Sequence, residues 1–211
     1  MTRKGNTNTQ VHKQPVSITG RIGAGGKRIV DSIVKGLSRF RVSPNLLTFI
    51  GLLINIFASV LFAKGFFFWA GLVVIFAGIF DIVDGEVARL TQRVTKFGAF
   101  FDSVIDRYSD LLLLLGLMLW YGKMDRMFYV ALTGLVLIGS VMTSYTRARA
   151  ESLIPQCKVG FLERPERIVL MIIGALSGRM SAVLWVMAIL SNWTVFQRIW
   201  YTWRETSAME R

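Results

Sequence analysis

The sequence predicts an all-α, polytopic membrane protein with six transmembrane helices, preceded by a juxtamembrane amphipathic helix. Two observations on composition favour this fold class: 53% of the 211 residues are hydrophobic and 18% are charged, whereas soluble domains carry about 25% charged residues. The third observation is a series of six apolar stretches, since a membrane-spanning helix needs about 20 mostly apolar residues. The stretches cover residues 46–63, 66–83, 98–121, 127–146, 167–176 and 181–201, and the fifth is short for a span.

Charge and hydropathy divide the chain into four segments. Residues 1–26 are polar and basic and are predicted to be a disordered arm. Residues 27–41 carry apolar side chains at helical spacing, which indicates an amphipathic helix on the membrane surface; a helix in a soluble core is the alternative. Residues 42–205 hold the six-helix domain, and residues 206–211 form a C-terminal tail.

Basic residues are distributed unevenly along the chain. Residues 1–41 contain nine basic residues and one acidic residue, which favours attraction to anionic lipid over nucleic acid, because no aromatic run accompanies them for stacking bases. Further basic residues gather after the second and fourth stretches and after the sixth. By the positive-inside rule, both termini and these two loops are expected on the cytoplasmic side of the plasma membrane.

Four aspartates near the second and third stretches are the candidate metal ligands. Asp81 and Asp84 are spaced i, i+3, and Asp102 and Asp106 are spaced i, i+4, so each pair lies on one helical face. If the two helices pack antiparallel, four carboxylates meet, and they repel one another unless cations are bound. Oxygen-only ligands fit two Mg²⁺ or Mn²⁺ ions, which are typical of displacement at phosphorus. The alternative is a set of interfacial charges that cap two helices.

The residues between the aspartate pairs fit the same chemistry. Gly85 and Ala88 keep the helix face small, so that a ligand can approach, and Arg89 is a planar donor for a phosphate. The cytoplasmic side should then carry a phosphate-binding site.

The complete motif resembles the signature of the CDP-alcohol phosphotransferase family at every defined position. It reads Asp81-Ile-Val-Asp84-Gly85-Glu-Val-Ala88-Arg89, then eight residues, Gly98, three residues, Asp102, three residues and Asp106. Three further segments are similar to the phosphatidylinositol phosphate synthase branch: Ser43-Pro44-Asn45 with Thr48, residues 144–151, and residues 163–167. One departure is Arg147, at a position where the branch often has Lys.

The resemblance implies a metal-dependent transfer of a phosphatidyl group from CDP-diacylglycerol, in a homodimer whose active sites open to the cytoplasm. It implies that Asp81, Asp84 and Asp102 bind one metal ion, that Asp81, Asp102 and Asp106 bind a second, and that Asp106 is also the general base. The residues that it places at the CDP-diacylglycerol head group are Asn45, Thr48, Gly85, Arg89 and Thr95, with Ala88 beside them.

A set of basic residues near the ends of the last three stretches is the candidate acceptor site. Positive-inside bias and local pairing with Glu151, Glu163 and Glu166 explain part of this charge. The remaining excess suits a phosphorylated acceptor, and the resemblance to the phosphatidylinositol phosphate synthase branch implies that this acceptor is myo-inositol phosphate. Glycerol 3-phosphate, an archaeal ether-lipid donor and an ion-coupled transporter are the alternatives. The candidate acceptor residues are Ser144, Arg147, Arg164, Arg198 and Arg204.

Overall fold

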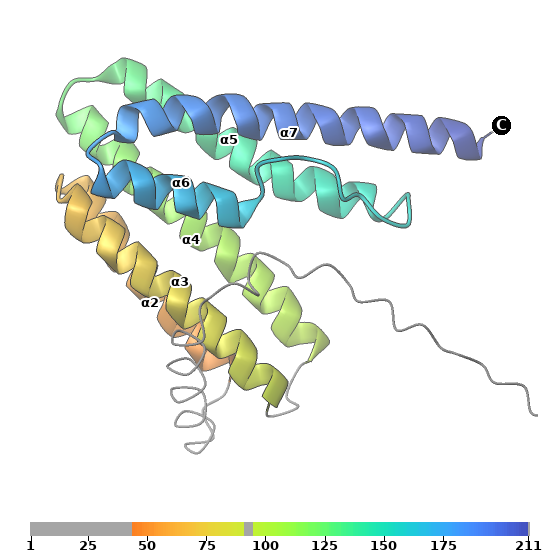
Figure 1. Cartoon of the computed structure of the whole chain (residues 1–211), viewed down its shortest axis with the longest axis horizontal. Coiled ribbons are helices and arrows are strands. Elements are labelled where there is room, and N and C mark those ends of the chain that lie inside the picture. Colours follow the sequence, from red (N-terminus) through yellow and green to blue (C-terminus); the bar gives the residue numbers. More distant parts are fainter. Residues whose placement is uncertain (1–43, 91–94, 211) are drawn as a thin grey trace, which may run out of the picture.

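The computed structural model describes residues 44–90 and 95–210, apart from the side chains of Pro44 and residues 83–90. Six α-helices and no strands are present in these residues (Figure 1). The predicted basic arm (1–26) and juxtamembrane helix (27–41) lie outside them. The helices are α2 (Pro44–Ala63), α3 (Phe67–Leu90), α4 (Lys96–Lys123), α5 (Met127–Ala150), α6 (Arg164–Leu176) and α7 (Met180–Met209).

Each of the six predicted apolar stretches forms a helix, and most of these helices extend beyond the apolar stretch. Helix α3 continues to Leu90, α5 to Ala150 and α7 to Met209. The extensions occur because a hydropathy pattern marks the apolar part of a helix, whereas the helix itself continues until its backbone is capped or turned. Helix α4 begins at Lys96, where the hydroxyl of Thr95 accepts a hydrogen bond of 2.9 Å from the Gly98 N–H.

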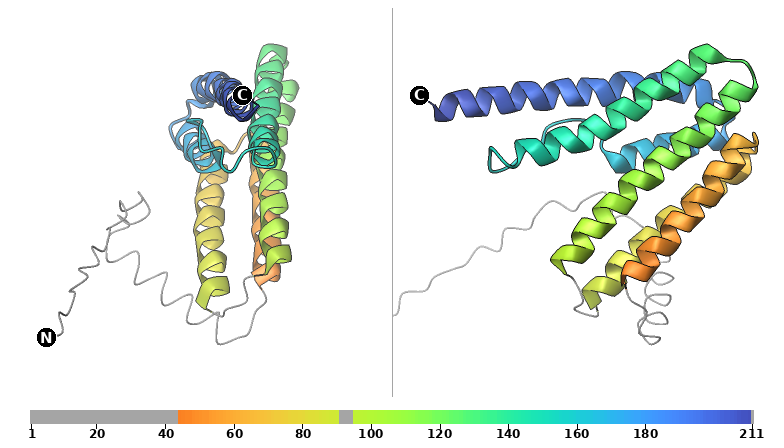
Figure 2. Two further views of the ribbon diagram at one scale, coloured as in Figure 1. Left: turned by 90° about the vertical axis from the view of Figure 1, so that its right-hand side faces the viewer. Right: turned by 180° about the vertical axis from the view of Figure 1, so that it is seen from behind.

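The six helices form a ring in which each packs mainly against two others. The order around the ring is α2, α3, α6, α7, α5 and α4, and α4 closes it by packing on α2. Figure 1 shows α5 and α7 side by side, and α6 lies between this pair and α3. In the left view of Figure 2, α3 and α4 stand on opposite sides of the group of helices. Helices that are distant in sequence, such as α3 and α6, are therefore neighbours.

Small residues allow the closest helix approaches. A Cβ atom at Gly116 of α4 would lie 2.3 Å from the backbone oxygen of Ser59 in α2, and one at Gly139 of α5 would lie 2.7 Å from Ser191 in α7. Close approach at small residues is typical of helix packing in membranes, where burial of apolar surface provides little driving force. The outer faces accordingly carry many exposed apolar side chains, including Phe57, Phe76 and Ile189.

Three helices in the described residues are long and apolar enough to cross a membrane, judged by length and composition: α2, α5 and α7. The apolar part of α3, Phe67–Ile82, is shorter. Helix α6 has 13 residues and is thus about 20 Å long, against about 30 Å for the hydrocarbon core of a bilayer. The structure therefore supports an integral membrane protein, and six spans stay a prediction.

Candidate active site

Three of the four predicted metal ligands come together. Carboxylate oxygens of Asp81 in α3 and of Asp102 and Asp106 in α4 all lie within 4.8 Å of one another, and all three residues are half-buried. Such oxygen-only donors suit hard divalent cations such as Mg²⁺ or Mn²⁺. The side chain of Asp84 lies outside the described part of the chain.

The two helices that carry these aspartates do not pack as closely as the sequence led us to expect. Helices α3 and α4 run in opposite directions (Figure 1), but each has its larger contact with α2. The carboxylates thus face each other across a space rather than across a tight helix contact. Repulsion between like charges opposes a direct contact at this point.

An arginine bridges the carboxylates across this space. Arg164, at the start of α6, places Nη1 3.0 Å from Asp81 Oδ2 and Nη2 2.9 Å from Asp106 Oδ1. The sequence placed Arg164 among the acceptor-binding residues, and the structure brings it directly to the predicted metal ligands. A guanidinium at this position can compensate the carboxylate charge and also face an anionic ligand.

Two charged residues next to this cluster were not among the predicted site residues. Asp110 accepts a hydrogen bond of 2.9 Å from Nη2 of Arg167, and the two side chains are only 7% and 3% exposed. Asp110 lies one helical turn after Asp106, so the i, i+4 spacing that paired Asp102 with Asp106 was the available signal. Arg167 has the same spacing to Glu163, which gives no indication of its burial.

A cavity of about 410 Å³ opens beside the aspartates. Asp81, Asp106 and Arg164 form its charged end, and Thr48, which is buried, also lines it. Such a space fits a lipid-linked ligand whose head group is charged. The apolar remainder of the wall comes from α2, α3, α4 and α6 and includes Leu52, Val74, Ile75, Ile79, Ile105, Ile168, Val169 and Ile172.

Two more of the predicted nucleotide-binding residues lie where α2 and α4 begin. A Cβ atom at Gly98 would lie 3.0 Å from Thr95 Oγ1 and 3.4 Å from Asn45 Oδ1, so Asn45 and Thr95 are neighbours. Gly85, Ala88 and Arg89 belong to the C-terminal part of α3, and the structure describes their backbone only.

Arg147 and Arg198, both predicted to contact the acceptor, share a carboxylate. Glu163 Oε1 lies 3.1 Å from Arg147 Nη1 and 2.7 Å from Arg198 Nη2. Arg147 also pairs with Glu151 at 3.2 Å. The predicted local pairing of Glu151 and Glu163 with nearby arginines is therefore confirmed. Glu166 instead accepts a hydrogen bond from the backbone N–H of Glu163.

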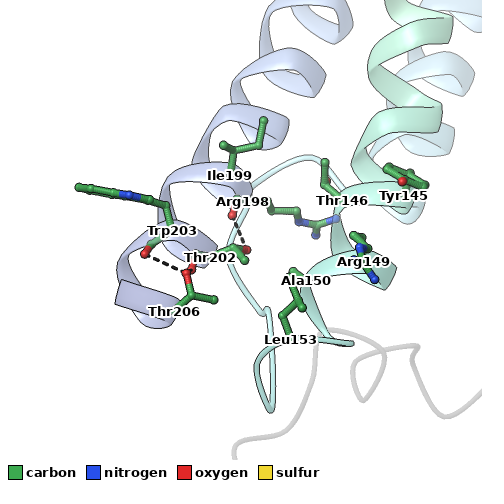
Figure 3. A pocket seen from close by; sticks show the side chains of 10 residues that line it. All are labelled: Tyr145, Thr146, Arg149, Ala150, Leu153, Arg198, Ile199, Thr202, Trp203 and Thr206. Atoms are coloured by element: carbon green, nitrogen blue, oxygen red, sulfur yellow. Dashed lines mark hydrogen bonds between the residues drawn. The ribbon is translucent and has the colours of Figure 1, made fainter. Parts of the chain in front are cut away.

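Arg198 is a structural residue in this conformation. It is 2% exposed, and it donates hydrogen bonds to the backbone oxygens of Val159 and Thr143 as well as to Glu163. Figure 3 shows its side chain reaching from α7 towards α5, beside a groove of about 240 Å³. Arg198 thereby fastens the α5–α6 loop to α7.

Ser144 and Arg204 lie apart from the carboxylate cavity. Ser144 is half-buried on α5. Arg204 is exposed and lines a second cavity of about 470 Å³ with Trp193, Trp200 and Tyr201, and no residue of that cavity lines the first.

Residues 41–202 match the family model described as CDP-alcohol phosphatidyltransferase. Because the match covers most of the chain, the chain belongs to this family, and it is a transferase.

Within this family, the chain is similar to two kinds of inositol phosphate lipid synthase. The archaetidylinositol phosphate synthase of Methanothermobacter thermautotrophicus is 36% identical over 84% of this chain and 90% of the relative. The crystal structure of the Mycobacterium tuberculosis phosphatidylinositol phosphate synthase with CDP-DAG bound has a TM-score of 0.78 at 33% identity, covering 83% of this chain and 94% of that one. The same synthase with manganese and citrate gives a TM-score of 0.76 at 33% identity, over 82% of this chain and 88% of that one.

Proposed function

We propose that the protein transfers a phosphatidyl group from CDP-diacylglycerol to a hydroxyl of myo-inositol phosphate and releases CMP. The observation that carries this proposal is the meeting of Asp81, Asp102 and Asp106 with Arg164 at the charged end of a largely apolar cavity. The two kinds of synthase named above differ in the lipid and share inositol phosphate in their names, which supports this acceptor.

Two Mg²⁺ or Mn²⁺ ions are proposed as cofactors. The donor set fits them, because three carboxylates converge in the described part of the site without a nitrogen or sulfur ligand among the grouped residues. Asp81, Asp84 and Asp102 would hold one ion, and Asp81, Asp102 and Asp106 the other. When bound, such ions stabilise the negative charge that develops on the attacking and leaving oxygens.

The protein's own residues bind the substrates and move the proton. Asn45, Thr48 and Thr95, with Gly85, Ala88 and Arg89, hold the cytidine diphosphate. Asp106 takes the proton from the acceptor hydroxyl, whose oxygen then forms a bond to the phosphorus next to the lipid. The bond from that phosphorus to the CMP oxygen breaks, and CMP leaves with its charge balanced by Arg89.

The acceptor phosphate is assigned to the basic residues, with Arg164 in direct contact. Arg164 is suited to this role because each of its two terminal amino groups already binds an anionic carboxylate oxygen, and phosphate oxygens are anionic acceptors of the same kind. Ser144, Arg147, Arg198 and Arg204, none of which lines the carboxylate cavity, are proposed to extend the acceptor site along α5 and α7. Glu163 now contacts both Arg147 and Arg198, so the acceptor phosphate would have to replace Glu163 as their partner.

The membrane arrangement is part of the proposal. We expect six spans and a homodimer, with both termini and the active site on the cytoplasmic side of the plasma membrane.

An ether-lipid donor is the second candidate for the lipid substrate, favoured by the sequence identity to the archaetidylinositol phosphate synthase.

The test is release of CMP by purified protein in lipid nanodiscs. We expect CMP from CDP-diacylglycerol with myo-inositol phosphate, but not with free inositol or glycerol 3-phosphate, and CDP-archaeol serves as the rival donor. EDTA should stop turnover, and Mg²⁺ or Mn²⁺ should restore it.

Two matched variants assign the reaction to the site. Asp106→Asn should reduce CMP release by a factor of about 10³ or more, because both the base and a metal ligand are lost. Asp125→Asn, which changes an exposed aspartate in the α4–α5 turn, should leave the rate unchanged. Equal rates in the two variants, or turnover that survives complete chelation, would refute the proposed chemistry.

A further inference from the structure

We propose that Asp110 and Arg167 are positioning residues that hold Arg164 in place when metal ions occupy the aspartates, so that its terminal amino groups face the acceptor phosphate. This inference rests on the proposed function, which makes Arg164 the acceptor-binding arginine. Neither residue belongs to the signature motif, and neither is one of the predicted metal-, donor- or acceptor-binding residues, although Arg167 lies in the segment 163–167 that resembles the synthase branch.

Asp110 is separate from the metal-binding group although it neighbours it. The oxygens that group within 4.8 Å are those of Asp81, Asp102 and Asp106, without Asp110. Asp110 is instead engaged by two arginines of α6: Arg167 Nη2 lies 2.9 Å from Oδ2, and Arg164 Nε lies 3.5 Å from Oδ1. Its carboxylate therefore has one oxygen for each arginine.

The contact between Asp110 and Arg164 is incomplete in this conformation. Asp110 Oδ1 and Arg164 Nε are both buried, and neither has a hydrogen-bond partner among the described residues. The distance of 3.5 Å between them is too long for a strong hydrogen bond. Buried polar atoms without partners are costly, and these two atoms can satisfy each other after a small movement.

Metal binding supplies a reason for that movement. Arg164 is held at present by Asp81 through Nη1 and by Asp106 through Nη2. If cations take these carboxylate oxygens, both terminal amino groups lose their partners, and Asp110 is the one remaining carboxylate that the described residues place against Arg164. Nε can then close on Asp110 Oδ1, which leaves Nη1 and Nη2 as a fork for a phosphate.

Arg167 fixes Asp110 for this task. Its guanidinium is almost fully buried, and it holds Asp110 Oδ2, so Oδ1 keeps a constant direction towards Arg164. Arg164 and Arg167 both lie in the first turn of α6, three residues apart on one helical face. The ion pair of Arg167 with Asp110 thus connects α6, which carries the acceptor-binding Arg164, to α4, which carries the proposed base Asp106.

The experiment compares Asp110→Asn with the wild-type protein, and Asp125→Asn is the matched control. Calorimetry in nanodiscs measures the affinity for myo-inositol 1-phosphate with Mn²⁺ present, and electron paramagnetic resonance measures Mn²⁺ binding. Asp110→Asn should lower the affinity for the sugar phosphate by about tenfold or more, because a charge-assisted contact to Arg164 is lost. Its Mn²⁺ affinity and its KM for CDP-diacylglycerol should stay within about twofold of wild type.

A second variant separates positioning from folding, since Asp110→Asn leaves Arg167 buried without its counter-charge. Asp110→Asn combined with Arg167→Met removes both charges, which often preserves the stability of a buried site. A purely structural pair would recover full acceptor affinity in the double variant, and that result would overturn the inference. We expect affinity to stay low.

The outcomes also distinguish this inference from the proposed function. If the wild-type protein releases CMP and Asp110→Asn keeps the wild-type affinity for the acceptor, only the positioning role is overturned. A loss of Mn²⁺ affinity as large as that in Asp106→Asn would make Asp110 a metal ligand instead. If the wild-type protein binds the sugar phosphate but releases no CMP, the proposed function is overturned. The acceptor affinities of the Asp110 variants then decide the positioning role by themselves. Absence of both would remove both proposals.

Discussion

Glu163 shows how a single residue can connect two arginines that differ greatly in burial. Its Oε1 contacts Arg147, whose side chain is 39% exposed, and Arg198, whose side chain is 2% exposed. Glu151 has almost the same exposure as Glu163, 38% against 39%, but it contacts Arg147 alone. The two glutamates thus differ in whether a buried charge depends on them, and Glu163 is in addition the N-cap of α6, where it forms a capping box with Glu166.

At this scale we predict that Glu163→Gln destabilises the protein more than Glu151→Gln. Loss of the carboxylate charge beside buried Arg198 should lower the free energy of unfolding by about 1–2 kcal/mol. The exposed pair of Glu151 should contribute less than about 0.5 kcal/mol. Thermal unfolding of both variants in the same detergent is the measurement, and equal shifts in midpoint would show that Arg198 relies on its two backbone carbonyl partners.

At the scale of the helices, small residues set the distances between α2 and α4 and between α5 and α7. Gly116 lies against the backbone of Ser59, whose hydroxyl donates a hydrogen bond to the Leu112 oxygen. Because a backbone atom is in the way, a side chain at Gly116 cannot be accommodated by a rotamer change. Gly134, in α5, has no atom within 4 Å of an added Cβ.

We therefore expect opposite effects from two identical substitutions. Gly116→Ala should destabilise the fold by about 1–3 kcal/mol, because α2 and α4 must separate. Gly134→Ala should be neutral or stabilising by up to about 1 kcal/mol, since alanine favours helix and meets open space. Denaturation midpoints in nanodiscs provide the comparison, and a Gly116→Ala variant as stable as Gly134→Ala would contradict the tight crossing.

The sequence predicted the helices and the aspartate cluster because both depend on local spacing. Hydropathy located each helix, and the i, i+4 spacing of Asp102 and Asp106 placed them on one face. The position of Arg164 could not be predicted in this way, because it lies 83 residues from Asp81 and reaches it only because α6 packs on α3. The burial of Arg198 depends likewise on Val159, in a loop without a periodic pattern.

At the scale of the whole molecule, the length of α5 and the basic residues beside it predict how the ring of helices sits in the membrane. Helix α5 is a candidate span of 24 residues and is thus about 36 Å long. The α4–α5 turn and the α5–α6 loop adjoin its two ends, so they should lie on opposite sides of a bilayer. The basic residues around the α5–α6 loop predict that this loop, next to the proposed acceptor site, faces the cytoplasm.

Cysteine labelling can test this orientation, because Cys157 is the single cysteine of the chain and is fully buried. Gln156→Cys in the α5–α6 loop and Met124→Cys in the α4–α5 turn both replace exposed residues. A membrane-impermeant maleimide should label Gln156→Cys in inverted vesicles and Met124→Cys in right-side-out vesicles, with wild type as the unlabelled control. Labelling of both positions from one side would mean that α5 does not span. Reversed labelling would place the aspartates on the side of the membrane opposite the cytoplasm. CDP-linked donors and sugar phosphates are made in the cytoplasm, so the proposed substrates would then have to be given up.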